Sequence, residues 1–199
     1  EEISQYIDWS PFFQTWELSG RYPAILDHPE KGKHARELFD DAQAMLQKII
    51  DEKWLQAQAV VGFFPANSVD HDDINIYTDE QRTEVQLQLH GIRQQMVKQG
   101  APNLCLSDYL QPQSSGVADF IGAFIVSTGI GIEEKLGDFE ADHDDYNSIM
   151  LKAMADRLAE AFAELMHIKV RRVLWAYAAE EELTNEQLIA EKYQGIRPG

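Results

Sequence analysis

The residue types that most readily support chemistry occur as two copies of Asp-His-Asp-Asp, at 70–73 and 142–145. His and Asp side chains together can bind a metal ion, which would suit a metal-dependent hydrolase. However, Asp is also common in turns, such as one before a strand, and acidic residues at a helix start complement the helix dipole. The sequence has no HExxH motif, no zinc-spaced cysteine pair and no complete EF-hand loop. We therefore expect neither copy to hold a metal.

Other motifs give even less support for local catalysis. The stretch "STGIGIEE" (127–134) has two glycines after a predicted strand but lacks the full GxGxxG pattern, so we expect a turn there. The single cysteine, Cys105, has leucine on both sides and is expected to be a buried thiol rather than a nucleophile. No P-loop or GxSxG motif is present, and we nominate no catalytic residue.

Composition narrows the class of protein. The chain has 199 residues, of which 44% are hydrophobic and 26% charged, as expected for one folded domain or at most two small ones. Its 17 Lys and Arg against 34 Asp and Glu give a net charge of −17, which disfavours nonspecific binding to nucleic acid or anionic membranes. No apolar run reaches the roughly 18 residues of a transmembrane helix. One cysteine fits a reducing compartment, so we expect a cytoplasmic protein.

Helical signals flank the middle of the chain. The aromatic-rich segment 1–26 is expected to wrap over the core, because aromatic side chains bury large areas. A helix is predicted from a cap at Asp27 to about Lys53, and a long helix over about 144–171, both from apolar residues at helical spacing. A final helix is predicted from a Thr184 cap to a stop at Gly195.

Strand signals occupy the middle. Buried strands are predicted at 59–64 and 119–129, and a further extended piece at 173–178. Segments 74–79 and 83–90 alternate apolar and polar residues and predict an antiparallel hairpin. Its inner face would hold Ile74, Ile76, Val85, Leu87 and Leu89. The order of elements lacks regular βαβ alternation, so the predicted fold class is α+β: a single helix-rich domain with an antiparallel sheet and helices outside it.

Several long stretches, in order and nearly end to end, carry a family resemblance. They are "YIDWSPFFQTWELSGRYPAIL", "VVGFFPANSVDHDDINIY", "RTEVQLQLHGIRQQ", "ADFIGAFIVSTG", "DFEADHDDYNSIMLKAMADRLAEAFAELMH" and "LTNEQLIAEKYQGIRPG". With them the chain resembles the C-terminal activation domain of cobalamin-dependent methionine synthase. The resemblance implies a helix-rich α+β fold with a twisted antiparallel sheet. It also implies that residues 1–199 form one activation domain that is incomplete at its C-terminus.

The resemblance implies a role in methionine biosynthesis. Domains of this family bind S-adenosylmethionine and dock on the cobalamin domain of the same enzyme when its cobalamin becomes oxidised. An electron from flavodoxin or another reductase and a methyl group from S-adenosylmethionine then restore methylcobalamin. The implied cofactors are thus S-adenosylmethionine and a cobalamin held by another domain. The chain would be part of a methyltransferase, and the isolated piece is expected to be inactive.

Two residues match the family's ligand contacts, and a third residue is a further candidate. Asp8 in "YIDW" matches the aspartate that holds the ligand's amino group, and Arg197 matches the arginine near its carboxylate. Glu160 is a third candidate, on the polar stripe of the long helix. On the sequence alone, Asp8 could instead cap the next helix and Glu160 could lie on a solvated face. The family's ligand loop continues past Arg197 and Pro198 into a "GYPACP"-like segment, so weak binding is expected. The alternative function is an acidic interaction module that docks a reductase or the cobalamin domain without a ligand.

Overall fold

The computed structural model describes residues 1–195, which fall into two compact units. Unit 1 contains Glu1–Ala59 and the described chain from Ile125 onward, and unit 2 contains Val60–Phe124. Arg197, one of the three predicted ligand contacts, lies outside the described residues.

Unit 1 contains the α-helices of the described chain. They are α1 (Ser10–Thr15), α2 (Gly32–Asp51), α3 (Ile132–Ala141), α4 (Asp145–Lys169) and α5 (Asn185–Ile189). Short 3-10 turns η1 (Ile3–Tyr6) and η2 (Ala24–Asp27) precede α1 and α2, and a π-helical turn η5 (Val170–Leu174) follows α4. None of the helices in the described part of the chain is both long enough and apolar enough to cross a membrane.

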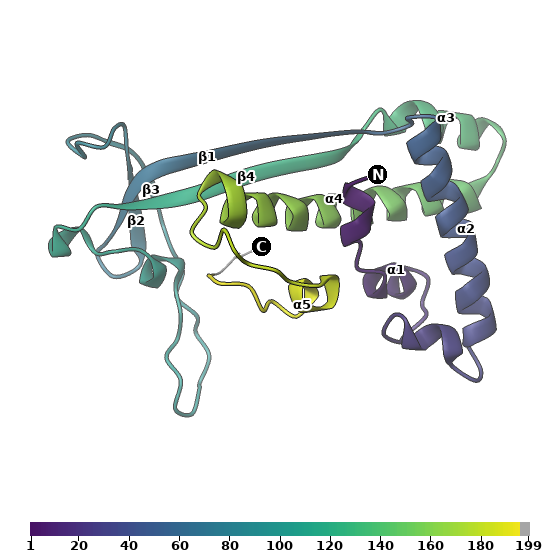
Figure 1. The fold of residues 1–199 in the computed structure, drawn as a ribbon, viewed down its shortest axis with the longest axis horizontal. Coiled ribbons are helices and arrows are strands. Elements are labelled where there is room, and N and C mark those ends of the chain that lie inside the picture. The colour runs from purple at the N-terminus through teal and green to yellow at the C-terminus, as the bar shows by residue number, and fades with distance from the viewer. Residues whose placement is uncertain (196–199) are drawn as a thin grey trace. The chain divides into compact units, whose positions relative to one another are not determined.

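The core of unit 1 is built around α4. This helix contacts α2, α1, α3 and η1, as Figure 1 shows for the elements around its green ribbon. The aromatic N-terminal segment packs into the same core: Ile7, Trp9, Phe12 and Phe13 are all buried, which confirms the prediction that it covers the core. The predicted stripe of α4 is also buried, except that Ile149 is 48% exposed.

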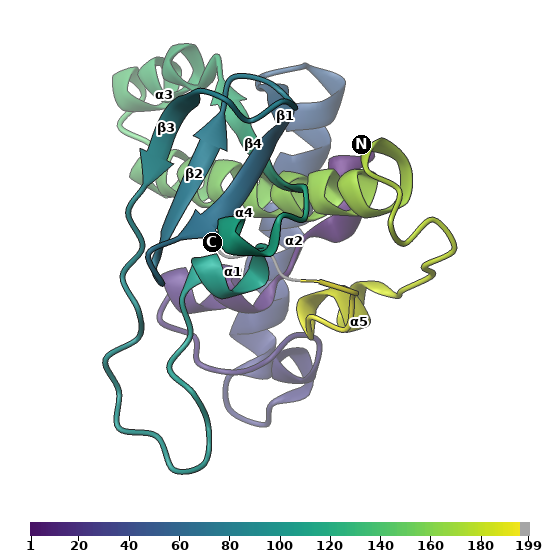
Figure 2. The same cartoon turned by 90° about the vertical axis from the view of Figure 1, so that its left-hand side faces the viewer.

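The four strands are β1 (Gln56–Val69), β2 (Asp73–Tyr77), β3 (Val85–Leu89) and β4 (Asp119–Ile130). They form one sheet in the order β3-β2-β1-β4 (Figure 2). β2 pairs antiparallel with β1 and with β3, and Ile74 and Ile76 lie opposite Leu89 and Leu87. The predicted hairpin and the α+β fold class are therefore confirmed.

The prediction that the strands are buried was wrong at most positions. Val60 on β1 is 73% exposed and Ile125 on β4 is 77% exposed. On the hairpin Ile74 is buried, but Leu87 on β3 is 52% exposed. A strand that is apolar on both faces needs a covering layer on each side to be buried. The described residues do not supply such layers over these positions.

Two predicted helix boundaries were also wrong. The helix predicted from Asp27 begins only at Gly32, because Asp27 ends the separate turn η2. The final helix ends at Ile189 rather than near Gly195, because Glu191 takes a left-handed φ of 53°. There Lys192 N–H donates to Gln187 O and Glu191 N–H to Leu188 O, which closes a Schellman motif without glycine.

The segment predicted as extended at 173–178 is not a strand. It begins in η5, where Trp175 N–H donates to Val170 O, and then turns back with Ala176 at a φ of 60°. The sequence "VLWAYA" is rich in residues that favour strands, but the preceding long helix continues into it. Helical hydrogen bonds that are already in place outweigh a weak local strand preference.

The starts of helices follow the predicted chemistry more closely. Asp144 caps α4 by accepting a hydrogen bond from Asn147 N–H, as expected for the second Asp-His-Asp-Asp copy. Thr184 and Gln187 form the predicted capping box of α5. The turn predicted in "STGIGIEE" is also present, and Gly131 there has a left-handed φ of 96°. Gly131 is the N-cap of α3, a helix that was not predicted from the sequence.

Candidate functional site

Asp8 lies at the start of the site, between two core residues. Ile7 and Trp9 on either side of it are 3% and 8% exposed, so the Asp8 side chain points away from the core. Its Oδ1 accepts a hydrogen bond of 2.9 Å from Ser10 N–H at the beginning of α1. Asp8 thus bonds to the start of α1, although the N-cap residue itself is Trp9. This hydrogen bond occupies one oxygen of the Asp8 carboxylate and fixes the orientation of that carboxylate.

Glu160 lies on the polar side of α4, next to a core-facing residue. Ala161 and Phe162 turn into the core, while Glu160 is exposed. Within residues 1–195 the Glu160 carboxylate has no hydrogen bond or ion pair. Glu164, one helical turn further on, is buried with only 8% exposed. Glu160 is therefore on a solvated part of α4, the alternative considered for it from the sequence, whereas Glu164 on the same stripe is not.

A cleft within unit 1 brings Asp8 and Glu160 together. It has a volume of about 190 Å³. Its lining comes from the N-terminal segment, from α4 and from the α5 region: Tyr6, Asp8, Pro11, Arg157, Glu160, Ala161, Glu164, Leu188, Ile189 and Glu191. The helical capping box and the burial of Leu188, 3% exposed, position the α5 side of this cleft.

The acidic cleft suits a cation. Four of its lining residues are carboxylic acids, and its one arginine, Arg157, is already paired with Asp156 at 2.6 Å. Carboxylates in a partly enclosed site attract ammonium and other cationic groups, since Coulomb attraction is stronger where water is partly excluded. The apolar rim at Pro11, Leu188 and Ile189 would accept an uncharged part of a ligand.

Two residues of this cleft, Asp8 and Glu160, were predicted from the sequence, and the others were not. Tyr6, Arg157 and Glu191 carry no motif of their own, because they come together only through packing of distant segments. Glu164 did have a signal, since it follows Glu160 by one helical turn on the acidic stripe.

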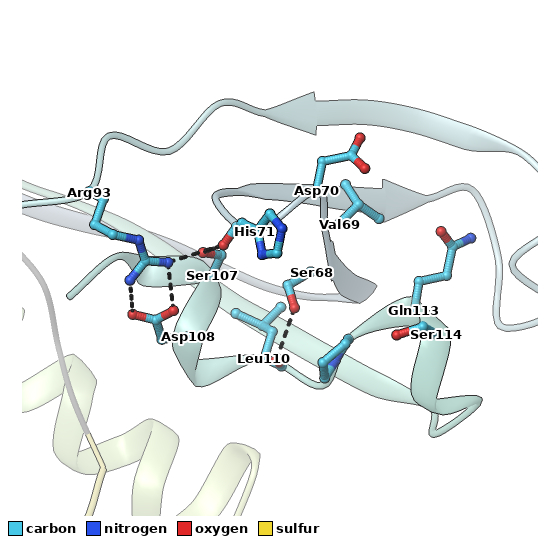
Figure 3. Close-up of a pocket in the computed structure, with 11 residues that line it drawn as sticks. Ser68, Val69, Asp70, His71, Arg93, Ser107, Asp108, Leu110, Gln113 and Ser114 are labelled. Carbon is cyan, nitrogen blue, oxygen red and sulfur yellow. Dashed lines mark hydrogen bonds and ion pairs between the residues drawn. The ribbon is translucent and has the colours of Figure 1, made fainter. Parts of the chain in front are cut away.

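A larger cavity lies within unit 2 and has a different character (Figure 3). Its volume is about 710 Å³, and its lining includes Ser68, Asp70, His71, Arg93 and Asp108. Arg93 is its single cation, and all five of its N–H groups have acceptors within unit 2. These acceptors are the carboxylates of Asp72 and Asp108 and the carbonyl oxygens of His71 and Asn103.

The interactions of this cavity are those of a structured loop. Hydrogen bonds from Arg93, joined by one from Cys105 N–H, lower the pKa of Asp108 to about 2, and the same carboxylates raise the pKa of Arg93. Ser107 Oγ also donates to His71 O at 2.8 Å. Because Arg93 and Asp108 bond to each other and to groups of the loop, the most strongly charged pair of this cavity is already engaged within unit 2. It is the weaker candidate despite its size.

The first Asp-His-Asp-Asp copy belongs to this loop. Asp72 pairs with Arg93 at 2.8 Å, and Asp73 Oδ2 lies 3.0 Å from His90 Nδ1. No group of three His, Cys, Asp or Glu side chains among residues 1–195 is arranged to hold a metal ion. Cys105 is buried, 6% exposed, which confirms its prediction as a buried thiol.

Comparisons with known proteins concern the chain as a whole. The family model of the vitamin B12 dependent methionine synthase activation domain matches residues 1–199. A solved structure, that of the MetH reactivation domain bound to AdoHcy, is 55% identical in sequence with a TM-score of 0.93. The match covers 98% of this chain and 60% of the other, so the chain spans about three fifths of that protein's length.

Proposed function

The chain belongs to the family of vitamin B12 dependent methionine synthase activation domains, and from this premise we propose that its acidic cleft binds S-adenosylmethionine. The ligand would serve the reductive remethylation of a cobalamin held by another domain of the same enzyme. The observation that supports this most is the meeting of Asp8 and Glu160 in one cleft. The similar reactivation domain was solved with S-adenosylhomocysteine, the demethylated form of the same ligand.

The chemistry of the lining residues fits the proposed ligand. S-adenosylmethionine carries an ammonium and a sulfonium, and the cleft has four carboxylic acids with a single, already paired arginine. Asp8 is the proposed acceptor for the ammonium, because its orientation is fixed by Ser10 N–H. Glu160 would contribute negative charge near the ligand. Arg197 is the proposed partner of the ligand's carboxylate, through paired guanidinium hydrogen bonds.

The residues of this chain bind and orient, and no catalytic side chain is proposed. Bound S-adenosylmethionine supplies an activated methyl group for reduced cobalt. The contribution of Asp8 and Glu160 would be to hold the amino acid part of the ligand, so that its methyl group has one orientation. The proposed protein partners are the cobalamin domain and flavodoxin or another reductase. The alternative of a purely acidic docking module gains no support from a neighbour that binds a ligand.

The test is a titration of the chain with S-adenosylmethionine and with S-adenosylhomocysteine, followed by calorimetry or by NMR. Binding of either ligand, weakened by Asp8→Asn and left unchanged by Glu140→Gln on the exposed surface of α3, is the expected result. If neither ligand binds at millimolar concentration, the proposal is wrong for this chain.

A further inference from the structure

The unit 2 cavity has no part in the proposed function. Its volume of about 710 Å³ falls within the range of small-molecule sites. Its lining comes from the end of β1, from the turn after β1, from Arg93 and from the segments around η3 (Leu106–Tyr109) and η4 (Gln113–Ser115). All of these residues belong to unit 2.

One wall of the cavity is attached to β1 by buried polar groups. Asn67, 3% exposed, donates from Nδ2 to Gln111 O and to Val117 O, both at 3.0 Å. Ser68 N–H donates to Gln111 O and Ser68 Oγ donates to Leu110 O, both at 3.1 Å. These hydrogen bonds hold the chain from Leu110 to Val117 beside the end of β1.

A second wall is the turn between β1 and β2, and it is fixed as well. His71 O accepts hydrogen bonds from Ser107 Oγ at 2.8 Å and from Arg93 Nη2 at 3.1 Å. Asp70 and His71 both have left-handed φ angles, of 50° and 77°, which glycine adopts with the least steric cost. Other residues in such conformations are concentrated at binding and active sites. Walls that are fixed before a ligand arrives lose little freedom on binding.

Four polar side chains of the lining are free to bind a ligand. Within the described part of the chain, the side chains of Asp70, His71, Gln113 and Ser114 make no hydrogen bond or ion pair, and no dashed line reaches them in Figure 3. Arg93 differs from them, because its N–H groups already have acceptors. Each wall thus carries two free polar side chains.

The charges of the lining disfavour an anionic ligand. Arg93 is the only Lys or Arg among the lining residues and is already engaged, so a phosphate or a carboxylate would find no free guanidinium or ammonium. The carboxylate of S-adenosylmethionine is disfavoured here for the same reason. Asp70 is a single exposed carboxylate, and one exposed charge binds a simple cation weakly.

Hydroxyl groups suit the free side chains better than a charge does. The imidazole, the carboxamide and the hydroxyl among them can donate and accept hydrogen bonds, as a sugar hydroxyl also can. The two oxygens of Asp70 can accept from two neighbouring hydroxyls. Val69, Leu110 and Pro112 add aliphatic surface to the lining, which suits the C–H face of a sugar ring.

We propose that the unit 2 cavity is a binding site for a neutral, polyhydroxylated ligand, that is, for a sugar. Asp70 and Gln113, one on each wall, bond to its hydroxyl groups, and the aliphatic lining covers a face of its ring. The cavity shares no lining residue with the acidic cleft. Its occupation therefore does not depend on the proposed function.

The test is an NMR titration of the chain with D-glucose and with trehalose, followed through the backbone amide shifts. We expect saturable shift changes at residues 68–71 and 110–114, with a Kd of about 1 mM. Trehalose should bind at least as tightly as glucose, because the cavity is larger than one sugar ring. Inorganic phosphate and methylammonium are the anionic and cationic probes, and neither should cause saturable changes there.

Two substitutions remove free groups without touching the bonds that hold the walls. Gln113→Ala and Asp70→Asn should each lower the affinity for trehalose by about three- to tenfold, the effect of losing one hydrogen bond. Asparagine tolerates a left-handed φ, so the turn at Asp70 should remain. Gln99→Ala, at another exposed glutamine of unit 2, is the matched control and should leave the affinity unchanged.

The titration of the parent chain maps the site without any substitution, so it stays decisive if a variant does not fold. The absence of saturable changes with both sugars would overturn the proposal, and so would parental affinity in folded Gln113→Ala and Asp70→Asn variants. Saturable binding of phosphate or methylammonium in place of the sugars would overturn the neutral ligand class. The titrations with S-adenosylmethionine judge the proposed function separately, through shifts around the acidic cleft.

Discussion

Asp8→Asn is the substitution that most directly separates the ligand role of Asp8 from its role at the start of α1. Asparagine retains an oxygen that can accept the hydrogen bond from Ser10 N–H, now 2.9 Å long. The local turn should therefore remain, and with it the burial of Ile7 and Trp9. What changes is the second oxygen, which becomes an NH₂ group that repels an ammonium.

The size of the effect follows from that change. A hydrogen bond to a charged group contributes about 1.5–3 kcal/mol, which corresponds to a loss of affinity of roughly 10- to 150-fold. Asp8 is only half-buried, and solvent screens exposed charges. We therefore expect the lower part of this range, about 10- to 30-fold, with the Tm unchanged.

The assay is a titration with S-adenosylmethionine at two salt concentrations, with Glu140→Gln as the surface control. Higher salt should weaken binding by the parent more than binding by Asp8→Asn, because the variant has lost one of the charges that salt screens. Parental affinity in a folded Asp8→Asn variant would refute the assignment of Asp8. A large drop in Tm would show instead that the helix-start role dominates.

Other predictions address the remaining groups. Glu160→Gln should lower the affinity for S-adenosylmethionine by only about two- to fivefold in the same titration, because an exposed charge contributes about 0.2–1 kcal/mol. A larger loss of affinity would mean that Glu160 contacts the ligand directly. The pKa of Asp108 is lowered to about 2, so its stabilisation of the unit 2 loop should be present above about pH 4 and be lost as the pH falls through about 2. Acid titration of hydrogen exchange across residues 91–110 would show this, and Asp108→Asn should remove the transition. Burial and a hydrogen bond to Asp41 raise the pKa of Tyr146 to about 12, so an ultraviolet titration should show a tyrosine that ionises near pH 12, and Tyr146→Phe should remove that step. Finally, this chain should bind S-adenosylhomocysteine at least tenfold more weakly than the longer reactivation domain it matches over 60% of that length; equal affinities would show that the remaining part is dispensable for binding.

Local signals in the sequence predicted much of unit 1. The apolar stripe of α4 and its Asp144 cap, and the capping box of α5, all depend on residues within one or two helical turns. Such short-range chemistry can be read without knowledge of the rest of the fold. The hairpin of β2 and β3 is similar, because its two strands are neighbours in sequence.

Predictions that depended on distant packing were less accurate. The apolar runs of β1 and β4 indicated burial, but burial depends on what covers a strand, and Val60 and Ile125 remain exposed. The η5 turn and the buried ion pair of Arg171 with Glu181 were missed for the same reason, since a lone arginine in the sequence does not show which distant carboxylate lies beside it.

The candidate site also depends on the packing of distant segments. Asp8 and Glu160 were chosen through a family resemblance, and they line one cleft although 152 positions separate them in the chain. Composition and periodicity could not have paired them. Arg197 stays a prediction, because it lies outside the described residues.

The measurement that tests the central claim most directly is a map of NMR shift changes in the chain on titration with S-adenosylmethionine. The proposed function predicts that the largest changes fall around the acidic cleft, at Asp8 and Ser10 and along Arg157–Glu164 of α4. Changes centred on the unit 2 cavity at Arg93 and Asp108, or no changes at saturating ligand, would contradict it.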